Sequence, residues 1–200
     1  RPRVHGVGGP VEGAPGAGKT TLGLEFIYRG VTEFNEPGLI ITFELTPQKL
    51  LRDAHGFGWA LEKLERDNKI KIIYTSPSVV IEELQSSDGL LMNEMNRIGV
   101  RRVLIDGLTP LRLYGASQSD RPFRETLHLL LETLQRHDVT AMLTREVPPS
   151  IEAYAADFSH EQFVCDTIFT LYLQPRGRYS VRQIEINKSR GQDFISGKHT

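Results

Sequence analysis

The sequence predicts an α/β fold in which a mostly parallel central sheet is flanked by helices. Short apolar runs rich in β-branched residues alternate with longer segments of helical periodicity. This alternation is typical of strand–helix–strand units, which place parallel strands in one sheet. Near the carboxyl terminus, two strand-like segments follow each other with only a turn between them. We therefore expect an antiparallel hairpin at the end of the chain.

The size and composition of the chain indicate one ordinary globular unit. We expect residues 1–200 to form a single domain with a sizeable core. The formal net charge is −1, so no global field would attract nucleic acid or an anionic membrane. No apolar run approaches the roughly 20 residues that a membrane helix needs. The only cysteine, Cys165, excludes an internal disulfide and is expected to be a small buried apolar side chain, which suits a cytoplasmic protein.

In the first half of the chain, helical periodicity alternates with β-branched apolar runs. The first helix ends before the breaker pair Pro37–Gly38. The pair Thr46–Pro47 is a typical helix start, and Gly56 would end that helix. In chain order we expect a helix over 19–34, a strand over 39–43, helices over 46–55 and 59–67, and a strand over 70–74.

The second half continues the pattern. Gly99 ends one helical segment, and a leucine-rich face that includes Leu127 and Leu134 predicts another. Residues 175–178 supply the turn of the carboxyl-terminal hairpin. In chain order we expect a helix over 81–98, a strand over 102–106, a helix over 121–137, a strand over 139–144, and hairpin strands over 164–173 and 179–187.

A glycine-rich run from Gly13 to Thr20 fits the phosphate-binding (Walker A) pattern G-x-x-x-x-G-K-[ST] in full. Its glycines let backbone N–H groups point at phosphate oxygens, and the next helix adds its positive amino-terminal dipole. Lys19 would reach the β- and γ-phosphates of ATP, and the Thr20 hydroxyl would bind Mg²⁺. A chance glycine-rich turn is the alternative, and the apolar helix that follows argues against it. The expected nucleotide-binding residues here are Gly13, Ala14, Pro15, Gly16, Ala17, Gly18, Lys19, Thr20 and Thr21.

A buried strand should precede this loop, but residues 8–12 are a poor candidate. Pro10 cannot donate to a sheet ladder, and Gly8 and Gly9 weaken a strand. We expect either a very short strand here or a strand built by residues outside the sequence given.

Three polar residues end buried strand-like runs. Asp106 could hold Mg²⁺ through its water shell, although Asp–Gly pairs also start turns. Glu44 could orient and deprotonate an attacking water, or it could be an exposed acid near the next helix. Thr144 could contact the γ-phosphate or the water, or it could be an ordinary polar strand end. For Glu44 and Thr144 the residues alone favour neither interpretation.

Lys188 and Arg190 follow the last predicted strand. Two cations at this spacing could reach a phosphate that a neighbouring subunit holds, as an arginine finger does. From the spacing alone, a solvated strand end is the favoured interpretation.

Taken in order, these motifs resemble the KaiC-like branch of the RecA-type ATPases. The resemblance covers about residues 13–197, nearly the whole chain. Besides the glycine-rich loop and its helix, it rests on residues 36–44, 46–48, 56–59, 105–109, 163–168 and 186–191.

The resemblance implies a RecA-like core that binds ATP and Mg²⁺ and assembles into a homo-oligomeric ring, commonly a hexamer, with ATP between subunits. It implies that Glu44 is the catalytic acid and that Gly56 lies near the nucleotide. It further implies that Lys188 and Arg190 contact the nucleotide of the next subunit.

The sequence departs from the family pattern at three places. KaiC-type proteins carry a glutamate pair after the second strand, whereas here Leu45 follows Glu44, so turnover is expected to be altered. Phe194 stands where the family often has a histidine near the base. Gln162 and Phe163 stand where the kinase-type second domain carries its phosphorylated Ser and Thr. The chain therefore resembles the ATPase-type first domain more than the second.

The leading expectation is a Mg²⁺-dependent ATP hydrolase with a regulatory or signalling role, whose nucleotide state changes ring shape and binding of a protein partner. The alternatives are a DNA-binding recombinase-like protein, a Ser/Thr autokinase, and a nucleotide-dependent scaffold with almost no turnover. Nucleic acid is not the expected partner, because residues 145–162 carry four acids against one arginine. The autokinase lacks the expected acceptor residues.

Overall fold

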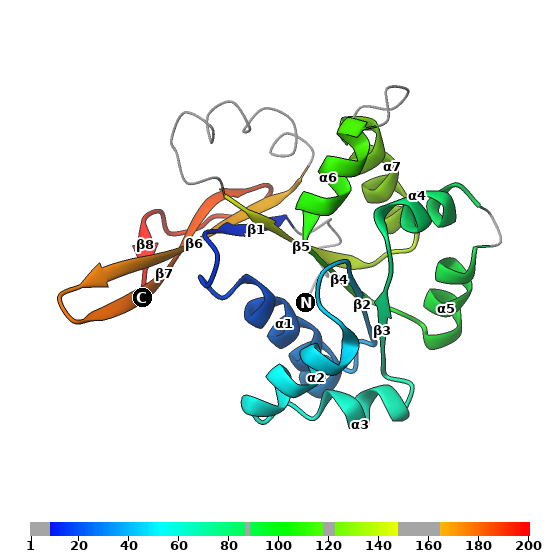
Figure 1. The fold of residues 1–200 in the computed structure, drawn as a ribbon, viewed down its shortest axis with the longest axis horizontal. Coiled ribbons are helices and arrows are strands. Elements are labelled where there is room, and N and C mark those ends of the chain that lie inside the picture. The colour runs from blue at the N-terminus through cyan, green and yellow to red at the C-terminus, as the bar shows by residue number, and fades with distance from the viewer. Residues whose placement is uncertain (1–8, 87–88, 118–122, 148–164) are drawn as a thin grey trace.

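The computed structural model describes residues 9–86, 89–117, 123–147 and 165–200. Within these residues the chain forms an eight-stranded sheet in the order β3-β2-β4-β5-β1-β6-β7-β8 (Figure 1). The strands from β3 to β6 pair in parallel, whereas β6–β7 and β7–β8 are antiparallel. The predicted α/β fold, with a mostly parallel sheet and a carboxyl-terminal hairpin, is confirmed. The strands are β1 (Pro10–Gly13), β2 (Gly38–Thr42), β3 (Ile70–Tyr74), β4 (Arg102–Asp106), β5 (Thr140–Glu146), β6 (Thr167–Arg176), β7 (Tyr179–Ser189) and β8 (Lys198–His199).

Helices cover both faces of the parallel part of the sheet, α1–α3 on one face and α4–α7 on the other (Figure 1). Successive residues of a strand point to opposite faces. Leu104 therefore packs with the α1–α3 layer, whereas Ile105 packs with the α4–α7 layer. The described helices are α1 (Lys19–Phe34), α2 (Pro47–Gly56), α3 (Leu61–Arg66), α4 (Pro77–Gln85), α5 (Leu90–Ile98), α6 (Leu108–Ser117) and α7 (Phe123–Arg136).

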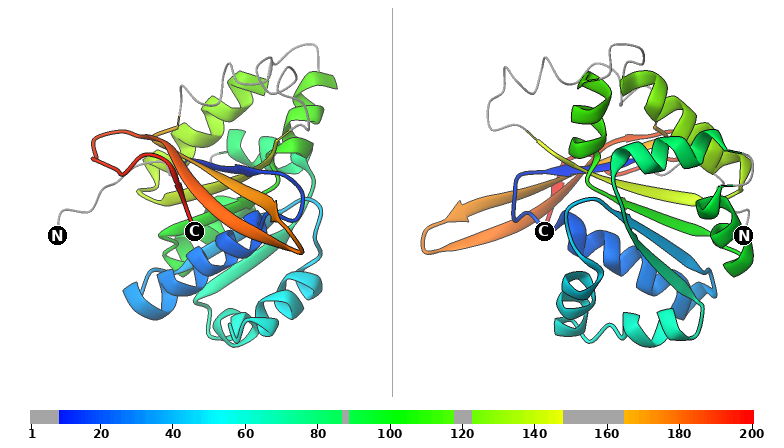
Figure 2. Two further views of the ribbon diagram at one scale, coloured as in Figure 1. Left: turned by 90° about the vertical axis from the view of Figure 1, so that its left-hand side faces the viewer. Right: turned by 45° about the vertical axis from the view of Figure 1, so that its right-hand side comes forward.

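The β6–β7 hairpin extends beyond the helical layers (Figure 2). Its strands remain paired from Thr167 to the turn, where Gly177 has a left-handed φ of 63°. Most of the outer half of the hairpin is exposed to solvent. The hairpin therefore leaves the body of the sheet as a two-stranded arm.

The prediction of a single helix over residues 81–98 is wrong, because the structure has two helices there. Ser86, which follows α4, has an extended ψ of 130°, and Gly89, which precedes α5, has a ψ of 145°. Val80 from α4 and Leu91 from α5 are buried in the same core cluster. This shared burial made the apolar periodicity look continuous.

Helix α6 is an element that the sequence analysis did not predict. Pro110 lies in the first turn of α6, where the missing N–H of proline has no helical acceptor to lose. Leu108 and Leu111 of this helix are buried. Burial of its apolar side therefore outweighs the breaker signal.

The strand before the glycine-rich loop is only four residues long, yet it lies inside the sheet between β5 and β6. Pro10 stands at its first position, the place in a strand where proline is tolerated. A Cβ built on Gly9 would overlap the carbonyl oxygen of Thr167. Glycine is needed here because the backbone of β6 approaches closely.

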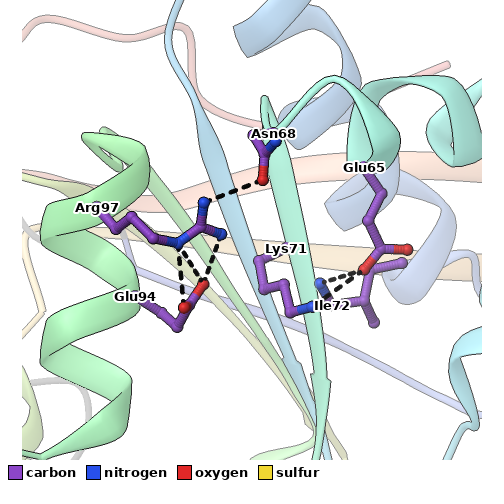
Figure 3. Close-up of polar contacts among 6 residues, drawn as sticks. All are labelled: Glu65, Asn68, Lys71, Ile72, Glu94 and Arg97. Atoms are coloured by element: carbon purple, nitrogen blue, oxygen red, sulfur yellow. Dashed lines mark hydrogen bonds and ion pairs between the residues drawn. The ribbon is translucent and has the colours of Figure 1, made fainter.

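The free edge of the sheet at β3 is occupied by side chains (Figure 3). The Glu65 carboxylate accepts from the backbone N–H of Ile72 at 3.3 Å. Arg97 donates to Asn68 Oδ1 at 3.0 Å and pairs with Glu94 at 2.8 Å. The Glu65 carboxylate thus occupies a backbone N–H of this edge strand, as charged side chains on sheet edges commonly do.

Replacing Gly9 by alanine should lower the free energy of unfolding by about 1–3 kcal/mol or more, because the added methyl group must displace the β6 backbone. Urea denaturation followed by circular dichroism measures the change. Gly56→Ala is the matched control, since a Cβ at Gly56 meets nothing within 4 Å. Equal stability of the two variants would contradict the close approach of β6 to Gly9.

Candidate functional site

The parallel strands β2, β4, β5 and β1 end at one edge of the sheet, where α/β proteins usually bind ligands. A cavity of about 330 Å³ lies at this edge. Its volume falls in the range of small-molecule sites. It is lined by Pro15, Gly16, Gly18, Lys19, Thr20, Thr21, Glu44, Leu45, Asp106, Gly107, Thr109, Thr144, Glu146 and Arg182.

The glycine-rich loop between β1 and α1 forms one wall of the cavity. Gly16 and Gly18 have left-handed φ values of 79° and 105°, which favour glycine. A Cβ at Gly16 would meet nothing within 4 Å, so the loop has open space above it. Helix α1 begins at Lys19, so the N–H groups of its first turn, which lack helical acceptors, lie beside the loop. This arrangement suits an anion such as a phosphate chain.

Lys19 lies folded against its own loop. Its Nζ donates to the carbonyl oxygens of Gly13 at 2.9 Å and Ala14 at 3.0 Å. Burial lowers the pKa of Lys19, while the carboxylates of Glu146, Asp106 and Glu44 act in the opposite direction. The ammonium group is thus held among three acids at the edge where an anion would bind.

Asp106 lies at the end of β4 and contacts two threonines. The Thr20 hydroxyl lies 3.1 Å from both carboxylate oxygens, and the Thr144 hydroxyl donates to Oδ1 at 2.8 Å. Burial raises the pKa of Asp106, although both hydroxyls and the charge of Lys19 oppose this shift. The N–H of Gly107 donates to the Thr144 hydroxyl at 2.8 Å. Thr144 therefore orients the Asp106 carboxylate.

Thr20 and Asp106 fit a Mg²⁺ ion. Hydroxyl and carboxylate oxygens are the donors that Mg²⁺ prefers, and these two side chains are in direct contact. Over the part of the chain that the structure describes, there is no group of three or more His, Cys, Asp or Glu that could hold a metal by itself. Mg²⁺ usually needs only one or two protein ligands when substrate phosphates supply the others.

Glu44 is exposed and faces the same cavity from the end of β2. The turn that carries it is closed by Thr42, whose hydroxyl accepts from the N–H of Leu45 at 3.2 Å and donates to its carbonyl at 3.0 Å. The Leu45 side chain packs against the α1–α3 core cluster. The position after Glu44 thus contributes apolar packing instead of a second carboxylate.

Three residues proposed for the site lie apart from this cavity in their own chain. Gly56 is exposed at the end of α2 and does not line the cavity. Lys188 pairs with Ile168 near the amino end of β6, and the backbone N–H of Arg190 donates to the carbonyl of Asp166 at 2.8 Å. Because β6 runs parallel to β1, both cations lie toward the amino ends of the parallel strands, whereas the cavity lies at their carboxyl ends.

Sequence reasoning missed three polar side chains that line the cavity: Glu146, Thr109 and Arg182. Glu146 ends β5, so the signal that identified Asp106, an acid after a buried strand, could have identified it as well. Arg182 lies near the start of β7 and reaches within 3.9 Å of a Cβ built on Gly18. No local pattern marks Arg182, since only the folding of the hairpin against β1 brings it there.

Some predictions concern residues outside the described part of the chain, namely Gln162 and Phe163 and most of the acidic segment 145–162. Cys165 is described and is buried, as predicted for a small apolar side chain. Among the helices that the structure describes, none is both long enough and apolar enough to cross a membrane.

Comparison with known proteins identifies relatives along nearly the whole chain. The family described as "ATPase: KaiC" matches residues 9–200. The chain is 34% identical over 198 residues to the circadian clock oscillator protein KaiC of Synechococcus elongatus. It is 33% identical over 198 residues to KaiC 1 of Synechocystis sp. and 30% identical over 197 residues to KaiC of Nostoc sp.. Each alignment covers 94% of this chain but 37% of the relative, so the chain spans little more than a third of their length.

Asp106→Asn should raise the melting temperature at pH 7, because asparagine keeps the shape of a side chain whose ionised form is disfavoured by burial. The folded-state pKa of Asp106 lies above its ordinary value of 3.8. The destabilisation by Asp106 therefore grows as pH rises from about 3.8 to the folded-state pKa and is constant above it. The gain in the variant should shrink toward pH 4. Thermal melts from pH 4 to 8 measure it, and a gain that grows on acidification would contradict the assignment.

Proposed function

Because the chain belongs to the KaiC family of ATPases, which it matches over residues 9–200, we propose that it is a Mg²⁺-dependent ATP hydrolase. Its core is the RecA-like α/β fold of that family. The observation that carries the proposal is the contact of Thr20 with Asp106 beside Lys19, at the mouth of an open glycine-rich loop. Loop, cation and metal-binding oxygens thus surround one cavity.

The loop residues bind the triphosphate in this proposal. The N–H groups at the start of α1 donate to phosphate oxygens, and Lys19 exchanges its two carbonyl acceptors for the β- and γ-phosphates. Thr20 and Asp106 would hold Mg²⁺, which would neutralise negative charge on the phosphate oxygens. Thr144 keeps the Asp106 carboxylate oriented through its 2.8 Å hydrogen bond.

Glu44 acts as the general base. It accepts a proton from water while the water oxygen forms a bond to the γ-phosphorus, and the bond from that phosphorus to the bridging oxygen of ADP breaks. The products are ADP and inorganic phosphate. Lys19 and Arg182, which line the same cavity, stabilise the negative charge of the phosphate oxygens.

Lys188 and Arg190 act in trans. In their own chain both lie toward the edge of the sheet opposite the loop, so they would reach the nucleotide of a neighbouring copy in a ring. Arg190 lies 3.9 Å from Asp166 in an ion pair, and both side chains are substantially exposed. An exposed ion pair contributes little to stability, so this contact does not hold the guanidinium strongly in place. The ring, commonly a hexamer in this family, completes the site.

The relatives are named as circadian clock oscillator proteins, and this chain spans 37% of their length. We extend to this chain only a regulatory or signalling role, in which the nucleotide state of a ring controls binding of a protein partner. One observation favours a variant of this role with very slow turnover. Leu45 packs against the α1–α3 core cluster and supplies no second carboxylate beside Glu44. The rate of phosphate release by the assembled ring distinguishes a hydrolase from a nucleotide-dependent scaffold.

Lys19→Ala is expected to abolish ATP binding, because the variant loses the cation that contacts the phosphates. Glu44→Gln should bind ATP with affinity within about threefold of the wild type but lose turnover by about 10²–10⁴-fold, the usual contribution of a general base. Fluorescent-nucleotide titration and a phosphate-release assay measure the two effects.

Controls for these variants come from α3, where Lys63 and Glu62 are exposed. Lys63→Ala and Glu62→Gln make the same chemical changes away from the cavity and should leave both binding and turnover unchanged. Undiminished phosphate release by Glu44→Gln would remove Glu44 from the mechanism.

Mixing two inactive variants tests the trans arrangement. Arg190→Ala alone and Lys19→Ala alone should each lose turnover. Equal mixing should restore about a quarter of the wild-type rate, the chance that a subunit with Lys19 faces a neighbour with Arg190 in a ring. Phosphate release before and after subunit exchange measures this recovery. A mixture as inactive as its components would contradict the proposal that Arg190 acts on a neighbour.

A further inference from the structure

A buried ion pair joins β1 and β5, two of the strands that lead into the proposed nucleotide site. Arg145 of β5 and Glu12 of β1 are opposite each other in the sheet, with Nη2 of Arg145 3.3 Å from Oε1 of Glu12. Their side chains are 3% and 0% exposed. Arg145 points to the same sheet face as Ala141 and Leu143, which pack in the α4–α7 layer. The pair is therefore on the far side of the sheet from α1.

Each member of the pair is adjacent in sequence to a group of the site. Glu12 precedes Gly13, whose carbonyl oxygen accepts from Lys19 Nζ at 2.9 Å and from the N–H of Val147 at 3.2 Å. Arg145 follows Thr144, which donates to Asp106 at 2.8 Å. The pair thus joins the strand that anchors Lys19 to the strand that orients Asp106.

The same polar row continues across the sheet. Glu12 is in register with Thr170 of β6, Thr170 with Glu185 of β7, and Glu185 with Lys198 of β8. Tyr172 donates to Glu185 at 2.8 Å, and Lys198 Nζ lies 3.9 Å from the centre of the Tyr172 ring. The row therefore reaches β7, which also carries Arg182, a residue three positions before Glu185.

Stability alone is a poor explanation for such a pair. Removing two charges from water opposes their attraction, and apolar pairs of similar volume are often as stable or more so. A charged pair adds a preferred position of one strand relative to the other, because the interaction of the two charges depends on their distance and orientation. Strands β1 and β5 must keep a fixed offset for Lys19 and Asp106 to serve one ligand.

We propose that Glu12 and Arg145 are positioning residues, which set the place of the phosphate-binding loop relative to Asp106. The inference rests on the proposed ATP site and specifies which buried groups hold its two halves together. Neither residue touches the nucleotide. Both act through their chain neighbours, Glu12 through Gly13 and Lys19, and Arg145 through Thr144 and Asp106.

The test is the double variant Glu12→Leu/Arg145→Met, which replaces the pair by apolar side chains. It should melt close to the wild-type temperature. Because the loop itself stays intact, ATP affinity in EDTA should remain within about twofold. Because Lys19 and Asp106 lose their mutual position, the factor by which Mg²⁺ tightens ATP binding should fall by about tenfold, and kcat should fall similarly. Titration with a fluorescent ATP analogue, with and without Mg²⁺, gives this ratio without needing turnover.

A conservative single variant completes the test. Arg145→Lys keeps a cation opposite Glu12 and should retain more of the Mg²⁺ effect than the double variant. A double variant with the wild-type Mg²⁺ effect overturns the proposal. Should the double variant melt too low to assay, Glu12→Gln/Arg145→Gln, which removes both charges but keeps polar side chains, takes its place, and a wild-type Mg²⁺ effect in that variant overturns the proposal. Failure of the wild-type chain to bind ATP would contradict the proposed function, whereas these outcomes concern only the pair.

Discussion

The contact between Thr20 and Asp106 depends on β5, which lies between β4, the strand that ends in Asp106, and β1, the strand before the glycine-rich loop. The glycine-rich loop follows β1 and Asp106 ends β4, but β5 separates the two in the sheet. Neighbouring strands are about 4.8 Å apart, so β1 and β4 lie about 10 Å apart. The loop and the first turn of α1 span this gap and bring Thr20 to 3.1 Å from the carboxylate, while Thr144 of β5 holds that carboxylate from below. Phosphate loop, metal-binding acid and supporting hydroxyl thus form one unit.

Burial places the two central charges of this unit in an unfavourable state. Each group loses part of the hydration that stabilises its charge. This loss lowers the pKa of Lys19 and raises the pKa of Asp106. In the proposed complex, phosphate oxygens and Mg²⁺ replace that hydration with fixed opposite charges. Functional sites commonly retain such local instability, because the same desolvation strengthens their interaction with a charged ligand.

Strand β7 runs from the end of the sheet that carries the glycine-rich loop to the opposite end. Because it is antiparallel to β6, Arg182 near its start lies beside Gly18. Lys188 near its end, and Arg190 just after it, lie toward the amino ends of the parallel strands. Burial and the nearby charge of Arg190 lower the pKa of Lys188. In the proposed ring, one strand would therefore contact the nucleotide of its own chain and that of the neighbour. The polar row that begins at Glu12 and Arg145 crosses this strand at Glu185, between the two groups of cations.

The sequence by itself determined the fold class, the order of most elements and the loop from Gly13 to Thr20, because these depend on short-range periodicity and on a local backbone motif. It also pointed to Asp106, since an acid that ends a buried strand is a local signal. Tertiary structure decided the rest. Strand β1, whose sequence is a poor strand signal, lies inside the sheet because β6 packs against Gly9. The segment predicted as one helix over 81–98 forms α4 and α5, which share a core cluster. Strand order and register place Arg182 beside the glycine-rich loop, and they place Glu12 opposite Arg145. Both depend on contacts between residues far apart in the chain.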